Sequence, residues 1–149
     1  MLAPLIAASP RRRLEGPVLQ LIEPISFWGG VSPIDGLLTD PRSSRHGQSV
    51  AGRVLMIREL RGSSSASSVL LELVYKRIAP CAIVLAVPDA ILALGVLVAA
   101  EMGWEAPGIF RLAAAEQASI PDEALISIDP DGHAQINAAL LNPQRLRGI

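Results

Sequence analysis

The apolar run CAIVLAVPDAILALGVLVAAEMG, residues 81–103, decides the fold class of this chain. It is long enough to cross a membrane, but Pro88 and Asp89 lie near its middle, where a membrane span disfavours a charged side chain. Two shorter elements joined by a turn explain it better. Residues 81–87 are a β-type run, Pro88–Asp89 is a turn and helix cap, and the following helix ends near Gly103. The pattern predicts a strand-turn-helix unit and no membrane segment.

Further elements flank this unit on both sides. Residues 52–60 (GRVLMIREL) and 107–113 (PGIFRLA) have β-type composition, and residues 65–77 (SASSVLLELVYKR) place their apolar side chains on one helical face. Residues 18–31 (VLQLIEPISFWGGV) indicate an earlier strand, and residues 123–137 indicate a closing hairpin. This order predicts an α/β domain with a mixed sheet and flanking helices.

Turn-forming residues and the two ends of the chain indicate the expected limits of the domain. The Gly29–Gly30 pair predicts a bend, and residues 33–36 (PIDG) predict a reverse turn. Residues 1–14 are interpreted as a flexible leader, because their arginines follow the apolar run, whereas a secretory signal carries positive charge before it. We expect one domain over residues 15–138 and a C-terminal tail over residues 139–149.

Composition argues against several classes of function. Half of the 149 residues are hydrophobic and only 3% are aromatic, so few rings are available to stack on bases. A net charge of −1 supplies no general attraction to nucleic acid or acidic membranes. The single cysteine, Cys81, begins a buried-type run and by itself can hold neither an iron–sulfur cluster nor a structural zinc. This cysteine usage suits the reducing cytoplasm.

The serine-rich stretch RGSSSASSVL, residues 61–70, is the candidate binding site. A strand ends before it, Gly62 permits a tight turn, and the helix begins within the serines. The first amides of a helix lack internal partners and favour a carboxylate or phosphate, to which Arg61 would add a fixed charge. The alternative interpretation is that Ser65 or Ser67 only caps the helix. Neither a GxxxxGK[ST] phosphate loop nor a GxSxG nucleophile elbow is present.

Other candidate side chains have simpler explanations. The two histidines, His46 and His133, lie in polar loops and could act as bases, but loop histidines are more often solvated. Residues 11–13 (RRR) are typical of a solvated face or a loose start.

Four segments together resemble the small subunit of aconitase X, the divergent branch of the aconitase superfamily. They are EPISFWGGVSPIDGLLTD (23–40), HGQSVAGRVL (46–55), RGSSSASSVLLEL (61–73) and APCAIVLAVPDAILALGVLVAAEMG (79–103). They occur in the order of the family, and the resemblance extends over roughly residues 18–112. Their combination is far more specific than any one of them.

The resemblance implies a fold, a partner and a reaction. In that family the small subunit resembles the swivelling β/β/α domain of aconitase, and the large subunit carries the iron–sulfur cluster. The implied activity is that of a hydro-lyase, in which a hydroxyl leaves one carbon while a proton is removed from its neighbour. The cluster iron acts as a Lewis acid on the hydroxyl. No metal ligand is expected in this chain.

The resemblance also implies roles for the serine-rich stretch. It is similar to the Gly-Ser-Ser-Arg loop of aconitase, in which the serine after glycine is the general base. That position is Ser63 here, and Gly62, Ser64 and Ser65 would hold the substrate carboxylate. Ser65 stands where the arginine of the loop would fall, so the positive charge must come from elsewhere. Arg61 is the first candidate, and Arg42, Arg45 and His46 in the preceding polar loop are weaker ones.

Two substrates are associated with the family. Bacterial members dehydrate cis-3-hydroxy-L-proline, which leads to Δ1-pyrroline-2-carboxylate, and archaeal members dehydrate mevalonate 5-phosphate. The alanine- and arginine-rich composition and the absence of added lysines for a phosphate favour hydroxyproline. The alternatives are the mevalonate phosphate enzyme and a non-catalytic assembly module with the same fold.

Overall fold

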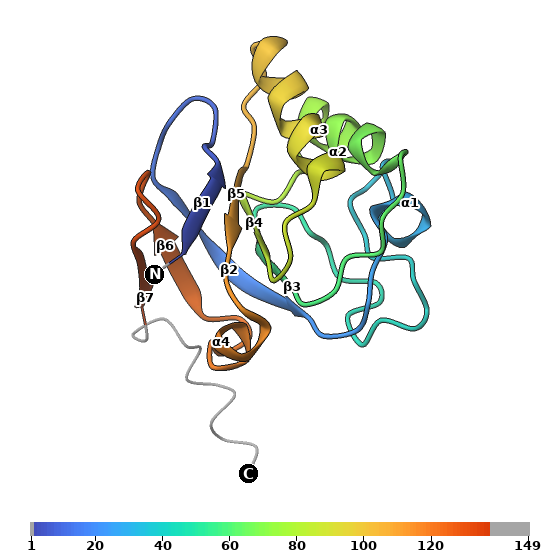
Figure 1. The fold of residues 1–149 in the computed structure, drawn as a ribbon. Coiled ribbons are helices and arrows are strands. Elements are labelled where there is room, and N and C mark those ends of the chain that lie inside the picture. Colours follow the sequence, from blue (N-terminus) through green and yellow to red (C-terminus); the bar gives the residue numbers. More distant parts are fainter. Residues whose placement is uncertain (1, 138–149) are drawn as a thin grey trace.

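A computed structural model describes residues 2–137 as one curled, seven-stranded mixed sheet (Figure 1). The strand order is β1-β5-β4-β3-β2-β6-β7. Strands β2 to β5 are mutually parallel, and β1, β6 and β7 pair antiparallel with their neighbours. The bounds are β1 Ala3–Ile6, β2 Leu14–Leu21, β3 Val54–Ile57, β4 Ala82–Leu85, β5 Gly108–Arg111, β6 Leu125–Ile128 and β7 Ala134–Asn137. The predicted mixed sheet is confirmed.

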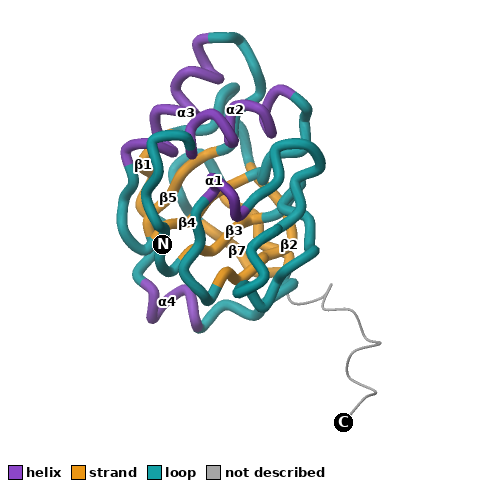
Figure 2. Tube along the Cα trace, turned by 90° about the vertical axis from the view of Figure 1, so that its right-hand side faces the viewer, coloured by secondary structure: helices purple, strands orange, loops and turns teal. Residues whose placement is uncertain are grey.

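Four helices surround the sheet. They are α1 Phe27–Gly30, α2 Ala66–Tyr75, α3 Ala90–Glu101 and α4 Ala114–Ala118. Helices α2 and α3 pack against each other on one side of the sheet, and α4 lies at the opposite end of the molecule (Figure 2). The two strand-helix units predicted around the serine-rich stretch and the long apolar run are therefore present.

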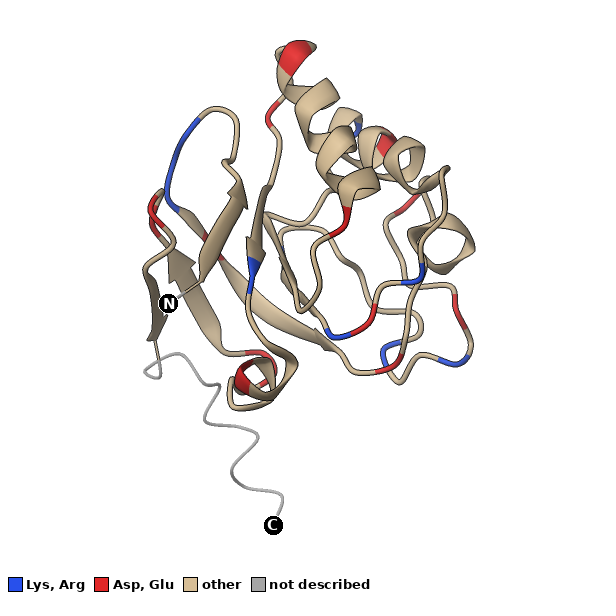
Figure 3. Ribbon diagram, in the orientation of Figure 1, with Lys and Arg blue, Asp and Glu red and all other residues tan. Residues whose placement is uncertain are grey.

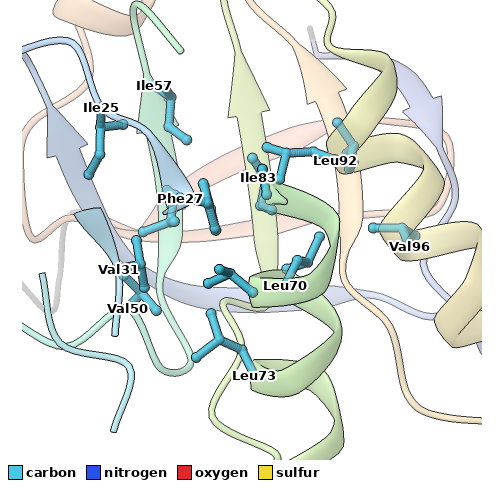
Figure 4. Packing of buried hydrophobic residues seen from close by; sticks show 14 of the residues in the cluster. Ile25, Phe27, Val31, Val50, Ile57, Leu70, Leu73, Ile83, Leu92 and Val96 are labelled. Atoms are coloured by element: carbon cyan, nitrogen blue, oxygen red, sulfur yellow. The ribbon is translucent and has the colours of Figure 1, made fainter. Parts of the chain in front are cut away.

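The central strands separate two apolar clusters. Along β3, Leu55 and Ile57 face the cluster beneath α2 and α3, whereas Val54 and Met56 face the opposite cluster. Figure 4 shows the first cluster, in which Leu70 of α2 and Leu92 of α3 lie near Ile83 of β4. Because parallel strands are covered on both faces, the runs in β3 and β4 read as continuously apolar rather than alternating.

The sheet curls until its two ends approach each other. The Leu2 amide donates a hydrogen bond to the Gly132 carbonyl at 3.1 Å, and Arg11 forms an ion pair with Asp131 at 2.7 Å. Gly132 has φ 91°, and a Cβ there would collide with the Leu2 carbonyl oxygen. Only glycine fits where the start of the chain meets the β6–β7 turn.

The first residues differ from the sequence prediction. Instead of a flexible leader over residues 1–14, Ala3–Ile6 form β1, paired with β5, and Ser9 pairs with Ala106. The segment, APLI, is short, apolar throughout and contains a proline, so it lacks the alternating pattern by which a half-exposed strand is predicted, and its pairing with β5 holds it in place. The predicted tail, residues 139–149, lies outside the described residues.

The predicted turns and caps are confirmed. The Asp89 carboxylate accepts a hydrogen bond from the Leu92 amide at 2.9 Å at the start of α3. Gly29 adopts φ 81° at the predicted bend, and the Gly132 amide closes the β6–β7 turn on the Asp129 carbonyl. Within residues 2–137, the helices are too short or too polar for any of them to cross a membrane.

Candidate functional site

The serine-rich stretch lies in the connection from β3 to α2, at the carboxyl end of the parallel strands (Figure 1). A neighbouring loop supports its first half. The Ile25 amide donates to the Glu59 carbonyl at 3.1 Å, and the Arg61 amide donates to the Ile25 carbonyl at 2.8 Å. This short parallel pairing fixes the backbone immediately before Gly62, a support that the sequence analysis did not identify.

Ser63 makes the turn into the helix. Its Oγ accepts a hydrogen bond from the Ser65 amide at 3.3 Å, and its carbonyl accepts one from the Ala66 amide at 3.1 Å. Ser65 occupies the N-cap position, but its side chain makes no capping bond. Ser67 lies inside α2, and its hydroxyl reaches only the Ser64 carbonyl, at 3.5 Å. The alternative is therefore right for the position of Ser65, but no capping hydrogen bond comes from the side chain of Ser65, and Ser67 lies inside the helix.

Backbone N–H groups remain available at the start of α2. Among residues 2–137, neither the Ser64 amide nor the Ser67 amide donates a hydrogen bond. Such amides at a helix start, together with the helix dipole, favour an anion. The geometry is compatible with the anion-binding site predicted at the serine-rich stretch. That a substrate carboxylate occupies this site stays a prediction.

Helix α3 sets the position of this helix start. Gly95 of α3 faces the backbone of Ser67, and a Cβ at Gly95 would lie 3.3 Å from both the Cα and the carbonyl oxygen of Ser67. The missing side chain lets the two helices approach closely beside the serine-rich stretch. A lone glycine inside an apolar helix was the only sequence signal for this contact, and it was not used.

The nearby arginines differ in how they are engaged. Arg42 contacts the Asp40 carboxylate at 3.1 Å, and Arg45 forms an ion pair with Asp122 at 2.8 Å. Arg61 is exposed, and no carboxylate in the described part of the chain forms an ion pair with it. The hydrogen bonds from Arg42 lower the pKa of Asp40, and the charge of Arg61 contributes a smaller part. Arg61 is therefore the candidate whose charge remains open to a ligand.

The histidines stand apart from the serine-rich stretch. His46 is exposed in the loop that follows Asp40, and its amide donates to the Ser43 carbonyl at 3.1 Å. No hydrogen bond or ion pair in residues 2–137 joins His46 to the stretch. His133 lies on the β6–β7 hairpin and contacts Asp129 at 3.3 Å. Within the described residues, neither histidine is thus bonded to Arg61, Gly62 or the serines.

The described residues do not form a metal or cluster site. Burial raises the pKa of the Cys81 thiol to about 11, which keeps it protonated, and it lies where β4 begins, at the opposite end of the strand from the serine-rich stretch. Within residues 2–137, no group of three or more histidine, cysteine or acidic side chains could hold a metal ion. An iron–sulfur cluster therefore does not fit the part of this chain that the structure describes.

Comparisons with known proteins agree with this fold. A sequence profile described as the aconitase X swivel domain matches residues 7–137. The chain is 49% identical to a cis-3-hydroxy-L-proline dehydratase of Pseudomonas aeruginosa over 78 residues, which is 52% of this chain and only 13% of that protein. It is 31% identical to a phosphomevalonate dehydratase small subunit of Thermococcus onnurineus over 118 residues, 78% of this chain and 91% of that subunit.

A solved structure extends the similarity to three dimensions. The chain superimposes on a chain of the Thermococcus kodakaraensis aconitase X crystal structure with a TM-score of 0.75 and 26% identity. The superposition includes 91% of this chain and 97% of the other. The sequence matches and the structural superposition therefore indicate the same family of proteins.

Proposed function

The chain belongs to the aconitase X swivel-domain family, and on that premise we propose that it is the small subunit of an iron–sulfur hydro-lyase. The proposed reaction is the dehydration of cis-3-hydroxy-L-proline, which leads to Δ1-pyrroline-2-carboxylate. The proton and the hydroxide lost from adjacent carbons together make the water released. We place the enzyme in the cytoplasm, in keeping with its single free cysteine.

A large subunit would complete the active site and hold the cluster. Three observations support this division. The archaeal relatives are named small subunits, and most of the P. aeruginosa protein lies outside its match to this chain. The described residues also lack a ligand set for a cluster. By itself, this chain is expected to be inactive.

The observation that carries the proposal is the hydrogen bond from the Ser65 amide to Ser63 Oγ. A serine must be deprotonated to remove a proton from carbon, and a donor aimed at its oxygen stabilises the alkoxide. The start of α2 and the exposed Arg61 add positive potential at the same place. The alkoxide would take the proton, and the electron pair of the broken C–H bond would form the double bond as hydroxide leaves.

The remaining predicted residues would bind the substrate. Arg61 would pair with the substrate carboxylate, and the amides near Gly62, Ser64 and Ser65 would donate to the same group. His46, which does not contact the serine-rich stretch, is assigned only to the outer edge of the site.

Hydroxyproline is the first choice of substrate because the identity to the hydroxyproline enzyme is 49%, against 31–38% for the phosphomevalonate subunits compared. Phosphomevalonate is the second candidate, because the chain matches those subunits over most of their length. A non-catalytic assembly module is the third.

The test is an anaerobic assay of this chain, co-expressed with an aconitase X large subunit, on cis-3-hydroxy-L-proline. We expect Ser63→Ala to lower kcat by about 10²–10⁴-fold, the usual contribution of a general base. Ser68→Ala is the matched control, since Ser68 is an exposed serine of the first turn of α2 and is expected to keep wild-type kcat.

Each other outcome has a distinct meaning. Turnover of mevalonate 5-phosphate but not hydroxyproline would retain the mechanism and reject the substrate. Wild-type kcat for Ser63→Ala would reject the serine base and favour the assembly module.

A further inference from the structure

Helix α3 exposes an apolar surface on the side that faces away from the core. Its members, Leu94, Leu97, Val98 and Met102, are 52%, 49%, 38% and 58% exposed, and we call them the α3 stripe. They recur at helical spacing, so they form one continuous band along the helix. The opposite side of α3, which includes Leu92 and Val96, lies in the core (Figure 4).

The sequence of α3 is unusual for a helix with an exposed side. Between Asp89 and Glu101 it carries no charged residue (Figure 3). A surface helix normally has a polar outer face, and a helix that is apolar all round is normally buried on all sides. Contiguous exposed apolar surface of this kind marks a site of protein contact.

Helix α3 starts at the same edge of the sheet as the proposed active site. Val87, 71% exposed, lies between the carboxyl end of β4 and the Asp89 N-cap of α3. The Ala86 amide donates to the Ile57 carbonyl, the last residue of β3 before the serine-rich stretch. Farther along, Gly95 holds α3 against Ser67. The helix that carries the α3 stripe thus packs beside the serine-rich stretch, and the exposed Val87 lies at the same edge of the sheet.

We infer that the α3 stripe is the surface on which the large subunit docks. This inference rests on the proposed function, because a site shared between two chains requires the partner to reach the carboxyl edge. A partner seated over Ser63 would be adjacent to Val87 and the first turns of α3, and extending its contact along the stripe would bury the exposed apolar side chains.

A second copy of this chain is a poorer occupant. It would cover the first turns of α3 beside the serine-rich stretch and obstruct the partner that must complete the site. The expected partner surface is apolar at its centre. At the far end of the stripe, Met102 and Val98 line a groove of about 300 Å³ with Trp104 and Tyr75, which can receive one large apolar side chain.

The test is the affinity between this chain and the large subunit, measured by titration calorimetry together with light scattering of the purified complex. We expect the double variant Leu94→Asp/Leu97→Asp to raise Kd by about 30-fold or more, as for residues at the centre of an interface. The matched control is Ile136→Asp on β7, which changes another exposed apolar residue, 46% exposed, and should leave Kd unchanged. Circular dichroism checks that both variants fold.

The outcomes separate the inference from the proposed function. If the wild-type chain does not bind the large subunit, both are wrong. If it binds and the double variant binds equally well, only the docking surface is wrong. A wild-type homodimer that the double variant dissociates would assign the stripe to a second copy and overturn the inference. Ser63→Ala should bind with wild-type affinity, since its proposed role is chemical.

Discussion

The two ends of β3 carry arginines that serve different purposes. Arg53, just before the strand, is 15% exposed and donates to the Pro17 and Val18 carbonyls and to the Glu123 carboxylate at 2.6 Å. Arg61, just after the connection begins, is exposed and forms no ion pair with the described residues. One charge holds the fold together, whereas the other remains available to a ligand.

Backbone amides at the two ends of the sheet follow the same division. At the amino end of the parallel strands, the Gly52 amide donates to the Ala79 carbonyl and the Cys81 amide to the Arg53 carbonyl. At the carboxyl end, the Ser64 and Ser67 amides have no acceptor in the part of the chain described. The Ser64 and Ser67 amides are thus available to a ligand at the end where the site is proposed.

Among the variants that test this contrast between the two arginines, Arg61→Ala should have the largest effect. Loss of a charge-assisted contact to the substrate carboxylate should raise KM by about 10–100-fold, corresponding to roughly 1.5–3 kcal/mol. The urea midpoint of the chain should stay unchanged, because Arg61 has no ion pair to lose. Steady-state kinetics of the complex measures the change in KM, and equilibrium unfolding of the chain in urea measures its stability. An unchanged KM would remove Arg61 from the site, and Arg61→Lys should restore part of the loss.

The opposite result is expected for Arg53→Met. Removing three hydrogen bonds of a mostly buried guanidinium should lower the free energy of unfolding by about 1–3 kcal/mol, while KM of the folded complex stays at the wild-type value. Urea denaturation gives the first quantity. Arg77→Met, which changes an exposed arginine, is the control. If Arg53→Met and Arg77→Met were equally stable, Arg53 would not have the structural role proposed for it.

A smaller effect is expected for Gly95→Ala. Alanine is the better helix former by about 1 kcal/mol, and crowding of Ser67 offsets much of this gain, so stability should change by less than about 1 kcal/mol. The start of α2 must shift by a few tenths of an ångström, which should lower kcat several-fold because Ser63 moves with it. Wild-type kcat would show that α3 does not position the serine-rich stretch.

The last prediction concerns Cys81, which lies at the amino end of the parallel strands. With its pKa raised to about 11 by burial, the thiol should react with a thiolate-selective disulfide reagent at pH 8 roughly a hundredfold more slowly in the native chain than in urea. The native rate should climb as pH approaches 11. The protonated thiol favours the folded state, and this contribution is complete below about pH 8.5 and is lost as pH rises toward 11. If the Cys81 thiol reacted equally fast in the native and the unfolded chain at pH 8, its burial would be contradicted.

The elements that the sequence predicted are those with local signals. The strand-turn-helix unit at Pro88–Asp89 combines an apolar run, a turn and a capping carboxylate within a few residues, and the structure contains all three. Strand β1 and the five-residue helix α4 lack such signals. β1 is held by hydrogen bonds to β5, about a hundred residues away, and no local pattern encodes that pairing.

The same distinction applies to the candidate site. The position of the serine-rich stretch followed from its neighbours in sequence, because a glycine and serines stand between a strand and a helix. Arg61 was also the first candidate from its position in sequence, but the engagement of Arg45 could not be predicted, because its partner, Asp122, lies far along the chain. Which serine hydroxyl accepts the amide bond likewise depends on backbone torsions that composition does not determine.

The pairing of the first two strands also bears on how the chain folds during synthesis. Strand β1 pairs with β5, and one edge of β2 pairs with β6, which ends at Ile128. Neither of these pairings can form until most of the chain has left the ribosome. The first half of β2, Leu14–Pro17, therefore lacks its β6 partner until late in synthesis, and a topology so rich in distant pairings should refold more slowly than a helical protein of equal length.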